Sequence, residues 1–348
     1  MSYEIGMQAV NLQMPDEIPH TEYCDHPELI RQMTGLNPAD PDPAKAGRAW
    51  QEFYRTWKYD IVWNSCDGMD WKGRTSSMGH AEYMENGSDY NNQIYCPFKT
   101  EEDVLNFDAV QEFGLPDVRE WTEKFGRNYR EGQKQTPFLV FPGGYYNTLF
   151  SACIRIFGWE MFLASVPCDA ERFDKVLESI YKISEANFTA WSKTDIKVFI
   201  CHDDIVWTSG AVFHPDWYRK YIFPRYKRLW KILKDRGIKI LFCSDGNFDE
   251  FVGDIAGAGA DGFIFEPVTD LKSIVEKYGK TKVIIGNADC RILTFKGKKE
   301  IEQEVRRCVE LGKKCPGFFM AVGNHIPCNV PVENALYYFE LYDKMRRR

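Results

Sequence analysis

The stretch Ile238-Lys-Ile-Leu-Phe-Cys-Ser-Asp-Gly-Asn247 joins a short apolar run to a cluster of reactive side chains. The run that opens it is rich in β-branched and aromatic residues, a composition that predicts a buried strand. Gly246 breaks the pattern where a strand would pass into a loop. Cys243, Asp245 and Asn247 alternate along this exit, so we expect their side chains to face the same side. The stretch therefore predicts a site at the carboxyl end of a buried strand.

Strands and helices alternate through the second half of the chain. The expected strands are 197–201, 238–243, 262–266, 282–286 and 317–322, and the expected helices are 214–236, 247–258, 270–278, 298–311 and 331–347. Each strand except the first is separated from its predecessor by a helix, which predicts a parallel sheet. In a barrel of parallel strands, the chemistry lies at the carboxyl ends of the strands.

The first half is less regular but compatible with the same plan. The expected elements are a helix at 44–57, strands at 59–63 and 137–141, and long helices at 149–165 and 170–192. Residues 64–95 lack a clean period, which is typical of a long loop over an active face. We therefore predict one α/β domain over 1–348, a TIM (β/α)8 barrel at 59–348 preceded by an irregular, loop-rich extension at 1–58.

Composition excludes several functional classes. The 348 residues include 44 basic and 51 acidic side chains, and the net charge of -7 argues against a nucleic-acid or anionic-membrane partner. The sequence contains no run of about eighteen uncharged apolar residues, so we expect no membrane span. The eleven cysteines are scattered without a C-x-x-C pair, which predicts free thiols in the reducing cytoplasm. Nothing in the sequence fixes the oligomeric state, and a homo-oligomer stays open.

Six short motifs occur in order along the chain. They are Pro224-Arg-Tyr-Lys227, Phe242-Cys-Ser-Asp-Gly-Asn247, Gly257-Ala-Gly-Ala-Asp-Gly262, Glu266-Pro267, Gly286-Asn287 and Pro331-Val-Glu-Asn334. Together they resemble the uroporphyrinogen decarboxylase superfamily, well over the second half of the chain and loosely over the first. The resemblance implies a TIM barrel. It also implies one of several chemistries, because the superfamily includes the decarboxylase, corrinoid-dependent methyltransferases and cobalamin-independent methionine synthases.

The resemblance argues against decarboxylation of a porphyrinogen. The true decarboxylases carry arginines near their amino terminus that hold the carboxylates of the tetrapyrrole. In this chain, the resemblance places Pro19-His-Thr-Glu-Tyr-Cys24 at that region, and this stretch has no arginine. A polyanionic substrate needs fixed cations, ideally bidentate guanidinium groups, so this region favours another substrate.

The methyltransferase branches imply a zinc site. They hold zinc with a His-x-Cys pair at one strand end and a cysteine near the last strand, and methionine synthase adds a glutamate. The resemblance places Cys243 and Asp245 at the pair, Glu266 at the glutamate, and Asn324 beside His325 at the final cysteine. Cys243, Asp245, Glu266 and His325 are all ligand types and are the predicted zinc ligands. The alternative is a metal-free polar pocket in which Asp245 hydrogen-bonds a substrate.

A second cluster, Cys201-His-Asp-Asp204, follows another expected strand. The resemblance implies an Asp-Asp element that lines the pocket, so Asp203 and Asp204 are candidate substrate residues. Vicinal acids can also divide these roles, with one side chain pointing inward and the other capping a helix. Tyr145 and Tyr146 are expected at the mouth of the same face, where one of them could instead belong to the core.

These observations predict a corrinoid-linked methyltransferase. The predicted catalytic residues are Asp245, Glu266 and His325, and the predicted substrate-binding residues are Tyr145, Tyr146, His202, Asp203, Asp204, Asn247 and Asn287. The corrinoid would arrive on a separate protein, because the chain has no Asp-x-His-x-x-Gly element. The aromatic and methionine content of residues 64–95, including Trp71 and Met78, favours a small neutral or aromatic methyl donor of the methyl ether or methylamine type.

Two other classes stay open at this point. A decarboxylase or lyase of a small carboxylic acid would place a cation in the pocket, for which Arg291, Lys72 and Arg74 are the candidates. A non-catalytic binding protein would have an apolar pocket without convergent ionisable groups, and the cluster at the strand end argues against it.

Overall fold

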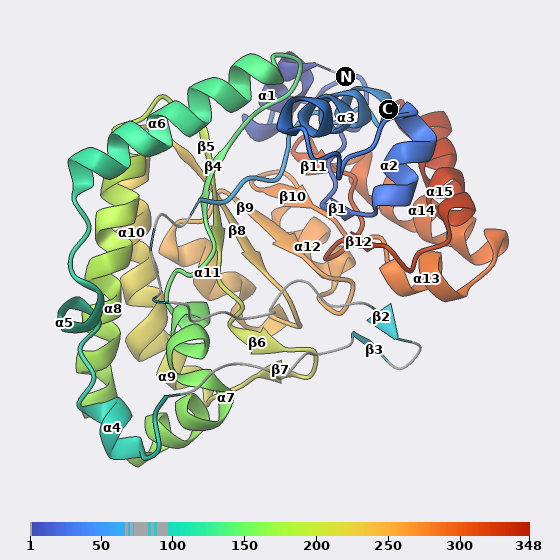
Figure 1. Cartoon of the computed structure of the whole chain (residues 1–348). Helices are drawn as coiled ribbons and strands as arrows, with labels where there is room; N and C mark the ends of the chain where they lie inside the picture. Colours follow the sequence, from blue (N-terminus) through green and yellow to red (C-terminus); the bar gives the residue numbers. More distant parts are fainter. Residues whose placement is uncertain (1, 67–68, 70–71, 73–82, 85–86, 89–96) are drawn as a thin grey trace.

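A parallel sheet forms the centre of the molecule in the computed structural model, which describes residues 2–66, 69, 72, 83–84, 87–88 and 97–348 (Figure 1). Its strands lie in the order β11-β10-β9-β8-β5-β4, and all neighbours are parallel. The strands are β4 (Gly143–Tyr145), β5 (Val198–His202), β8 (Lys239–Ser244), β9 (Gly262–Phe265), β10 (Val283–Ile285) and β11 (Phe318–Phe319).

Two short segments close this sheet into a barrel. His20 forms a parallel bridge with Met320, directly after β11, and its carbonyl accepts a hydrogen bond from Asp60 N at 2.8 Å. Ile61 then forms a parallel bridge with Val140, just before β4. The ring of hydrogen bonds is therefore continuous, and the predicted TIM barrel is confirmed. Its first segment, Pro19-His-Thr21, lies inside the range 1–58 that was expected as an extension, because so short a segment with two polar residues shows neither an apolar run nor an alternation in the sequence.

The expected strand at 137–141 is displaced toward β4. The side chain of Gln133 donates to the carbonyls of Thr136 and Leu139 and accepts from Phe141 N, so it takes up backbone groups that a strand partner would otherwise bind. Regular pairing in β4 therefore begins at Gly143.

Helices surround the barrel, and three smaller pairs of strands lie outside it (Figure 1). The helices are α1 (Tyr3–Val10), α2 (Pro27–Thr34), α3 (Pro43–Thr56), α4 (Glu101–Leu105), α5 (Ala109–Phe113), α6 (Val118–Gln135), α7 (Phe150–Cys168), α8 (Ala170–Trp191), α9 (Pro215–Trp217), η1 (Tyr218–Ile222), α10 (Phe223–Lys234), η2 (Asp249–Phe251), α11 (Val252–Ala258), α12 (Leu271–Tyr278), α13 (Cys290–Phe295), α14 (Lys298–Gly312) and α15 (Val332–Met345). The pairs are β1 (Cys24–Asp25) with β12 (Ile326–Pro327), β2 (Tyr83–Met84) with β3 (Gly87–Ser88), and β6 (Val206–Trp207) with β7 (Gly210–Ala211).

The core has two layers. The larger layer lies between the strands and the surrounding helices. The smaller one contains residues of the strands, such as Val198 and Leu241, together with Ala9 and Val10 of α1. Helix α1 therefore packs on the interior of the barrel, and a Cβ atom on Gly6 would lie 2.4 Å from Asp60 O. Helix α1 fills the barrel interior at one end, so we expect an open site at the opposite end, where the carboxyl ends of the strands lie.

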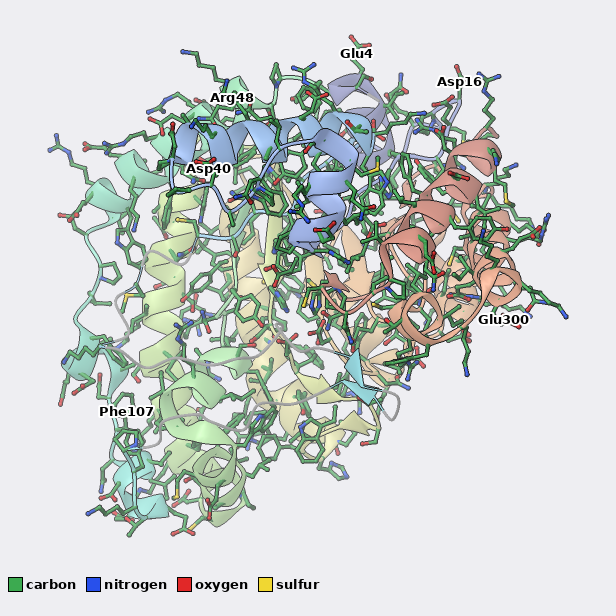
Figure 2. All side chains as sticks on the ribbon, turned by 45° about the vertical axis from the view of Figure 1, so that its right-hand side comes forward. Glu4, Asp16, Asp40, Arg48, Phe107 and Glu300 are labelled. Carbon is green, nitrogen blue, oxygen red and sulfur yellow. The ribbon has the colours of Figure 1, made fainter. Side chains whose placement is uncertain are left out.

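The outer surface is charged. Glu4, Asp16, Arg48 and Glu300 project from the periphery of the molecule (Figure 2). None of the helices in the described part of the chain combines the length and the apolar character that crossing a bilayer requires. The described residues include ten cysteines, and no disulfide joins any two of them. Trp71, Arg74 and Met78, on which part of the substrate prediction rests, lie outside the described residues.

Candidate active site

A pocket opens at the carboxyl ends of the barrel strands. Its space, counted with its open mouth, is about 760 Å3. The described residues that line it are Thr21, Glu22, Tyr23, Trp63, Ser65, Tyr146, His202, Cys243, Asp245, Ile264, Phe265, Ile285, Ala321, Val322 and Asn324. The side chains come from almost every strand of the ring, so the fold alone brings together residues that are far apart in the sequence. The predicted position of the site is therefore the position of this pocket.

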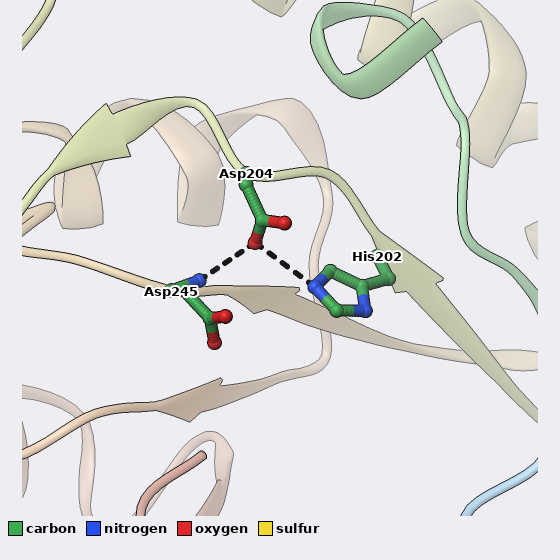
Figure 3. Close-up of side chains that lie close together, drawn as sticks. All are labelled: His202, Asp204 and Asp245. Atoms are coloured by element: carbon green, nitrogen blue, oxygen red, sulfur yellow. Dashed lines mark hydrogen bonds and ion pairs between the residues drawn. The ribbon is translucent and has the colours of Figure 1, made fainter. Parts of the chain in front are cut away.

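The last residue of β5 and the loop after it supply a histidine–aspartate pair (Figure 3). His202 Nε2 lies 2.9 Å from Asp204 Oδ1, and both residues are buried. A carboxylate oxygen accepts, so Nε2 carries the proton of this bond. The other ring nitrogen, Nδ1, is buried and has no hydrogen-bond partner in the described structure. A buried polar atom without a partner is rare in proteins and marks a place where a ligand, an ion or a water is expected.

Asp204 links three parts of the pocket wall. Besides His202, its carboxylate accepts from Asp245 N at 2.9 Å and from the Tyr146 hydroxyl at 3.3 Å. Burial acts to raise the pKa of Asp204, but the His202 charge and these hydrogen bonds outweigh it, so the pKa of Asp204 is lowered. The pKa of Asp245 is instead raised well above its usual range, by burial and then by the charges of Asp204 and Glu266. The surroundings therefore favour the ionised form of Asp204 and the protonated form of Asp245.

Asn324 joins the acids on the other side of the pocket. Its Nδ2 donates to Asp245 Oδ2 and to Glu266 Oε1, both at 3.0 Å. Glu266 Oε2 accepts from Gly246 N at 2.7 Å, where Gly246 has a positive φ of 79° that suits glycine. Asn324 also has a positive φ, 68°, which is uncommon for a residue with a side chain and is typical of functional sites. The amide therefore fixes the two carboxyl groups relative to each other.

Cys243 lies in the pocket wall between these acids. Its side chain is buried, and burial followed by the charges of Asp245, Asp204 and Glu266 raises the pKa of the thiol well above its usual range. Without a bound cation the thiol therefore keeps its proton, and its nucleophilicity is low.

The ligand types that converge most closely differ from the predicted set. Ligand atoms of His202, Asp204 and Asp245 all lie within 4.8 Å of one another. Of the four predicted zinc ligands, Cys243 and Asp245 line the pocket, and Glu266 reaches it through Asn324. His325 does not line the pocket. Its Nδ1 makes a hydrogen bond with Asn324 Oδ1, and its ring lies 5.9 Å from that of Tyr23.

The two vicinal aspartates divide their roles. Asp203 is fully buried and accepts from Leu149 N, Phe150 N and Ser151 N at the start of α7, at 2.6 to 3.0 Å. It also accepts from the Tyr226 hydroxyl at 2.5 Å. Asp203 is therefore an anchor for the helix terminus, where an anion is favoured, whereas Asp204 faces the site.

Three further predicted substrate residues lie outside the lining of the pocket. Tyr145 is buried in the core, with its ring 6.2 Å from that of Phe188, whereas Tyr146 lies in the pocket wall 4.0 Å from the His202 ring. Asn247 accepts from Asp249 N at the start of η2. Asn287 donates to the carbonyls of Glu266 and Thr269 and accepts from Arg307. Asn247 and Asn287 thus hold loop backbone in place rather than meet the open space.

The first barrel segment contributes residues that were not predicted. Thr21, Glu22 and Tyr23 line the pocket, in the region where the resemblance leads one to look for arginine. Glu22 is buried and accepts from Val322 N and the Tyr338 hydroxyl, both at 2.7 Å, and lies 3.0 Å from His20 Nε2. The absence of arginine was visible in the sequence, but the presence of an acid in the wall depends on the closure of the barrel.

Lysine and arginine are absent from the described lining of the pocket. Arg291 forms an ion pair with Asp289 at 2.7 Å, and Lys72 lies 3.2 Å from a carboxylate oxygen of Glu112 at an exposed site. Arg74 lies outside the described residues. The described wall therefore offers no guanidinium or ammonium group to pair with a carboxylate substrate.

A closed parallel barrel with an acidic pocket at the carboxyl ends of its strands defines a TIM-barrel protein with a candidate active site. Residues 94–345 match the family described as uroporphyrinogen decarboxylase (URO-D), and the chain belongs to that family. The predicted family is thereby confirmed.

Similar proteins fall into two groups. Uroporphyrinogen decarboxylase of Carboxydothermus hydrogenoformans is 27% identical over 175 residues, 50% of this chain and 47% of that protein, so the match spans about half of this relative. Uroporphyrinogen decarboxylase of Geotalea uraniireducens is 26% identical over 258 residues, 72% of each chain. The solved structure of a methyltransferase from Methanosarcina mazei superposes with a TM-score of 0.69 over 99% of both chains, at 14% identity. This structural similarity shows that the two proteins share a fold.

Proposed function

We propose that this protein is a methyltransferase that moves a methyl group from a small, uncharged or cationic donor to a corrinoid carried by a separate protein. The donor types that fit are methyl ethers and methylamines. Ten free thiols among the described cysteines suit a reducing compartment, and we place the reaction in the cytoplasm.

The observation that carries this proposal is the charge of the pocket. Its described wall contains Glu22, Asp245 and, directly behind them, Asp204 and Glu266, without a lysine or arginine. A substrate with several carboxylates needs cationic partners, and the described wall offers neither lysine nor arginine to pair with them. A methyl ether or an amine needs none. The sequence relatives named above are decarboxylases, but the wall lacks the cations that their substrate requires.

Three groups in the wall can assist the departure of the methylated heteroatom. Removal of a methyl group as a cation equivalent leaves an electron pair on oxygen or nitrogen, which must be protonated or otherwise stabilised. Without a bound metal, burial and the neighbouring acids raise the pKa of Asp245 and favour its protonated form, which can act as an acid. Asp204 fixes the ring of His202 through Nε2. Tyr146 and Trp63, with rings 4.0 and 5.5 Å from that of His202, shield the pair from water.

The donor set also fits a divalent metal ion such as zinc. One imidazole and two carboxylates within 4.8 Å of one another are ligands that zinc accepts, and Cys243 lies in the same wall. We propose that His202, Asp204 and Asp245 hold the ion. Their ligand atoms would then be deprotonated, so Asp245 would be a ligand and not an acid in the metal-bound protein. Glu266 and His325, two of the predicted zinc ligands, hydrogen-bond with Asn324. When bound, the ion would polarise the heteroatom that carries the methyl group.

The proposed activity is tested by supplying donor and acceptor directly. Purified protein is incubated with cob(I)alamin and a set of methoxyarenes and methylamines, and the formation of methylcobalamin is followed by absorbance. In parallel, uroporphyrinogen is supplied, and its decarboxylation is followed by chromatography. Methylcobalamin formation that depends on the protein and one donor class supports the proposal. Decarboxylation without methyl transfer would replace it with the decarboxylase alternative.

A further inference from the structure

A second cavity lies beside the candidate active site. Its space is about 490 Å3, and it shares Glu22, Tyr23 and Trp63 with the first pocket. The rest of its described wall comes from α3, the loop after it and β1, with Trp50, Tyr54 and Tyr59 as its aromatic members. We call this space the aromatic annex. It is separated from the candidate active site by the Tyr23 and Trp63 rings, whose centroids are 6.1 Å apart.

The rings of the annex lie close to one another at steep angles. Tyr54 and Tyr59 have centroids 4.9 Å apart at 55°, and Trp50 and Tyr54 have centroids 6.0 Å apart at 39°. Three aromatic residues that contact one another therefore line the same space. Aromatic faces carry partial negative charge, and groups of them bind quaternary ammonium ions, which have no N–H that could hydrogen-bond with water.

The charge of the annex does not oppose a cationic guest. Glu22 stands in its wall, and the described lining includes no lysine or arginine. The Glu22 carboxyl is held by Val322 N, the Tyr338 hydroxyl and His20 Nε2, so its position is fixed. Because the buried His20–Glu22 pair carries no net charge, the preference for a cation rests on the aromatic rings.

The hydroxyl of Tyr59 adds an independent sign of an absent ligand. Tyr59 is 1% exposed, and its hydroxyl has no hydrogen-bond partner in the described structure. Burial raises the pKa of Tyr59 well above 10, so the group remains a neutral donor and acceptor. A buried hydroxyl beside an open space is satisfied when a guest brings a polar group.

We propose that the aromatic annex is a binding site for a small methylated ammonium ion, one that carries a polar group within reach of Tyr59. The proposal concerns binding alone. It holds whether the neighbouring pocket transfers a methyl group or performs another reaction, and its test is independent of either.

The test compares choline with its uncharged isostere, 3,3-dimethylbutan-1-ol, by isothermal titration calorimetry on the intact protein. Choline is expected to bind saturably, with a dissociation constant of roughly millimolar or below, and the isostere at least about tenfold more weakly, the ratio expected for cation–π contacts. Equal binding of the two would show an apolar cavity and overturn the proposal. No binding of choline at about ten times that concentration would overturn it as well.

Variants locate the site. Trp50→Leu removes a partly exposed ring of the annex and is expected to weaken choline binding about tenfold or more. Trp207→Leu is the matched control, because Trp207 is exposed and lines neither cavity; it should leave binding unchanged. Tyr59→Phe keeps the ring and breaks no hydrogen bond of the described structure, so it should fold normally and weaken binding only a few-fold. Unchanged binding in a folded Trp50→Leu protein would exclude the annex.

Discussion

His202 Nε2 lies 2.9 Å from Asp204 Oδ1, and this pair connects the end of β5 to the end of β8, because the same oxygen accepts from Asp245 N. The two residues are separated by one position in the sequence. The pair leaves His202 Nδ1 buried without a partner in the described structure, at a pocket whose described wall has no lysine or arginine. The proposal of methyl transfer rests on this histidine–aspartate pair and on the absence of those two residue types.

The first prediction concerns the pair itself. Asp204→Asn is expected to lower kcat/KM about a hundredfold or more, because the amide cannot hold the imidazole with the same charge. Tyr146→Phe removes the 3.3 Å bond to Asp204 and keeps the ring against His202, so a loss of a few-fold is expected. Both are measured in the methylcobalamin assay. Equal losses in the two variants would contradict the role given to Asp204.

A second prediction uses the raised pKa of Asp245. In the folded, chelator-treated protein Asp245 keeps its proton at pH values where the unfolded chain, with a pKa of about 3.9, has lost it. The folded state then binds more protons than the unfolded state, so this group makes stability fall as pH rises above about 4. Asp245→Asn removes that penalty. The variant should melt above wild type at pH 7, with a difference that shrinks toward pH 4.

The melting temperatures are compared by scanning calorimetry at several pH values. Asp204→Asn provides the opposite sign, because the pKa of Asp204 is lowered. Its carboxylate stabilises the folded protein at pH values above the pKa that it has in the unfolded chain. This contribution is lost as the pH falls through the lower pKa that it has in the folded protein. A gain for Asp245→Asn that is the same at pH 4 and pH 7 would show that titration of this carboxyl is not its cause.

The third prediction separates Asp203 from Asp204. Asp203→Asn is expected to cost about 2–4 kcal/mol of unfolding free energy, because the carboxylate accepts three backbone amides of α7 and the Tyr226 hydroxyl. Tyr226→Phe removes one of these bonds and should cost about 1–2 kcal/mol. Urea titrations measure both. A stable Asp203→Asn protein with impaired activity would move Asp203 into the site.

The fourth prediction concerns the Cys243 thiol. Its pKa is raised by burial and neighbouring acids, so alkylation by iodoacetamide at pH 8 should be at least about a hundredfold slower than at the exposed Cys168. Peptide mass spectrometry over time gives both rates in one sample. Rapid labelling of Cys243 in the folded protein would mean that the thiolate is stabilised by a group outside the described residues.

Much of the fold was predictable, because periodicity is a local property. The strand from 238 to 243, its neighbours and the helices between them follow from apolar runs and glycine breaks, and the structure confirms them as β5, β8, β9, β10 and β11. The first barrel segment was not predictable in this way. Residues 19–21 pair through single bridges, and their position depends on Met320 and Asp60, which are remote in sequence.

The site was predictable in place but only partly in detail. Strand alternation puts Cys243 and Asp245 on one wall. The positive φ of Gly246 turns the chain, and the Asn247 side chain accepts from Asp249 N instead of lining the pocket. Which of Asp203 and Asp204 points inward depends on where α7 begins, a tertiary fact. The His325 ring hydrogen-bonds with the Asn324 side chain, and the backbone of Asn324 is left-handed. The sequence gives no signal for either feature.

The most direct measurement is the zinc content of the purified protein by elemental analysis, for wild type, His202→Gln and His325→Gln. We expect about one zinc per chain in wild type, loss of zinc in His202→Gln and retention of zinc in His325→Gln. The reason is that ligand atoms of His202, Asp204 and Asp245 lie within 4.8 Å of one another, whereas His325 hydrogen-bonds with Asn324. Loss of zinc in His325→Gln with retention in His202→Gln would contradict the assignment of the metal to the His202 wall.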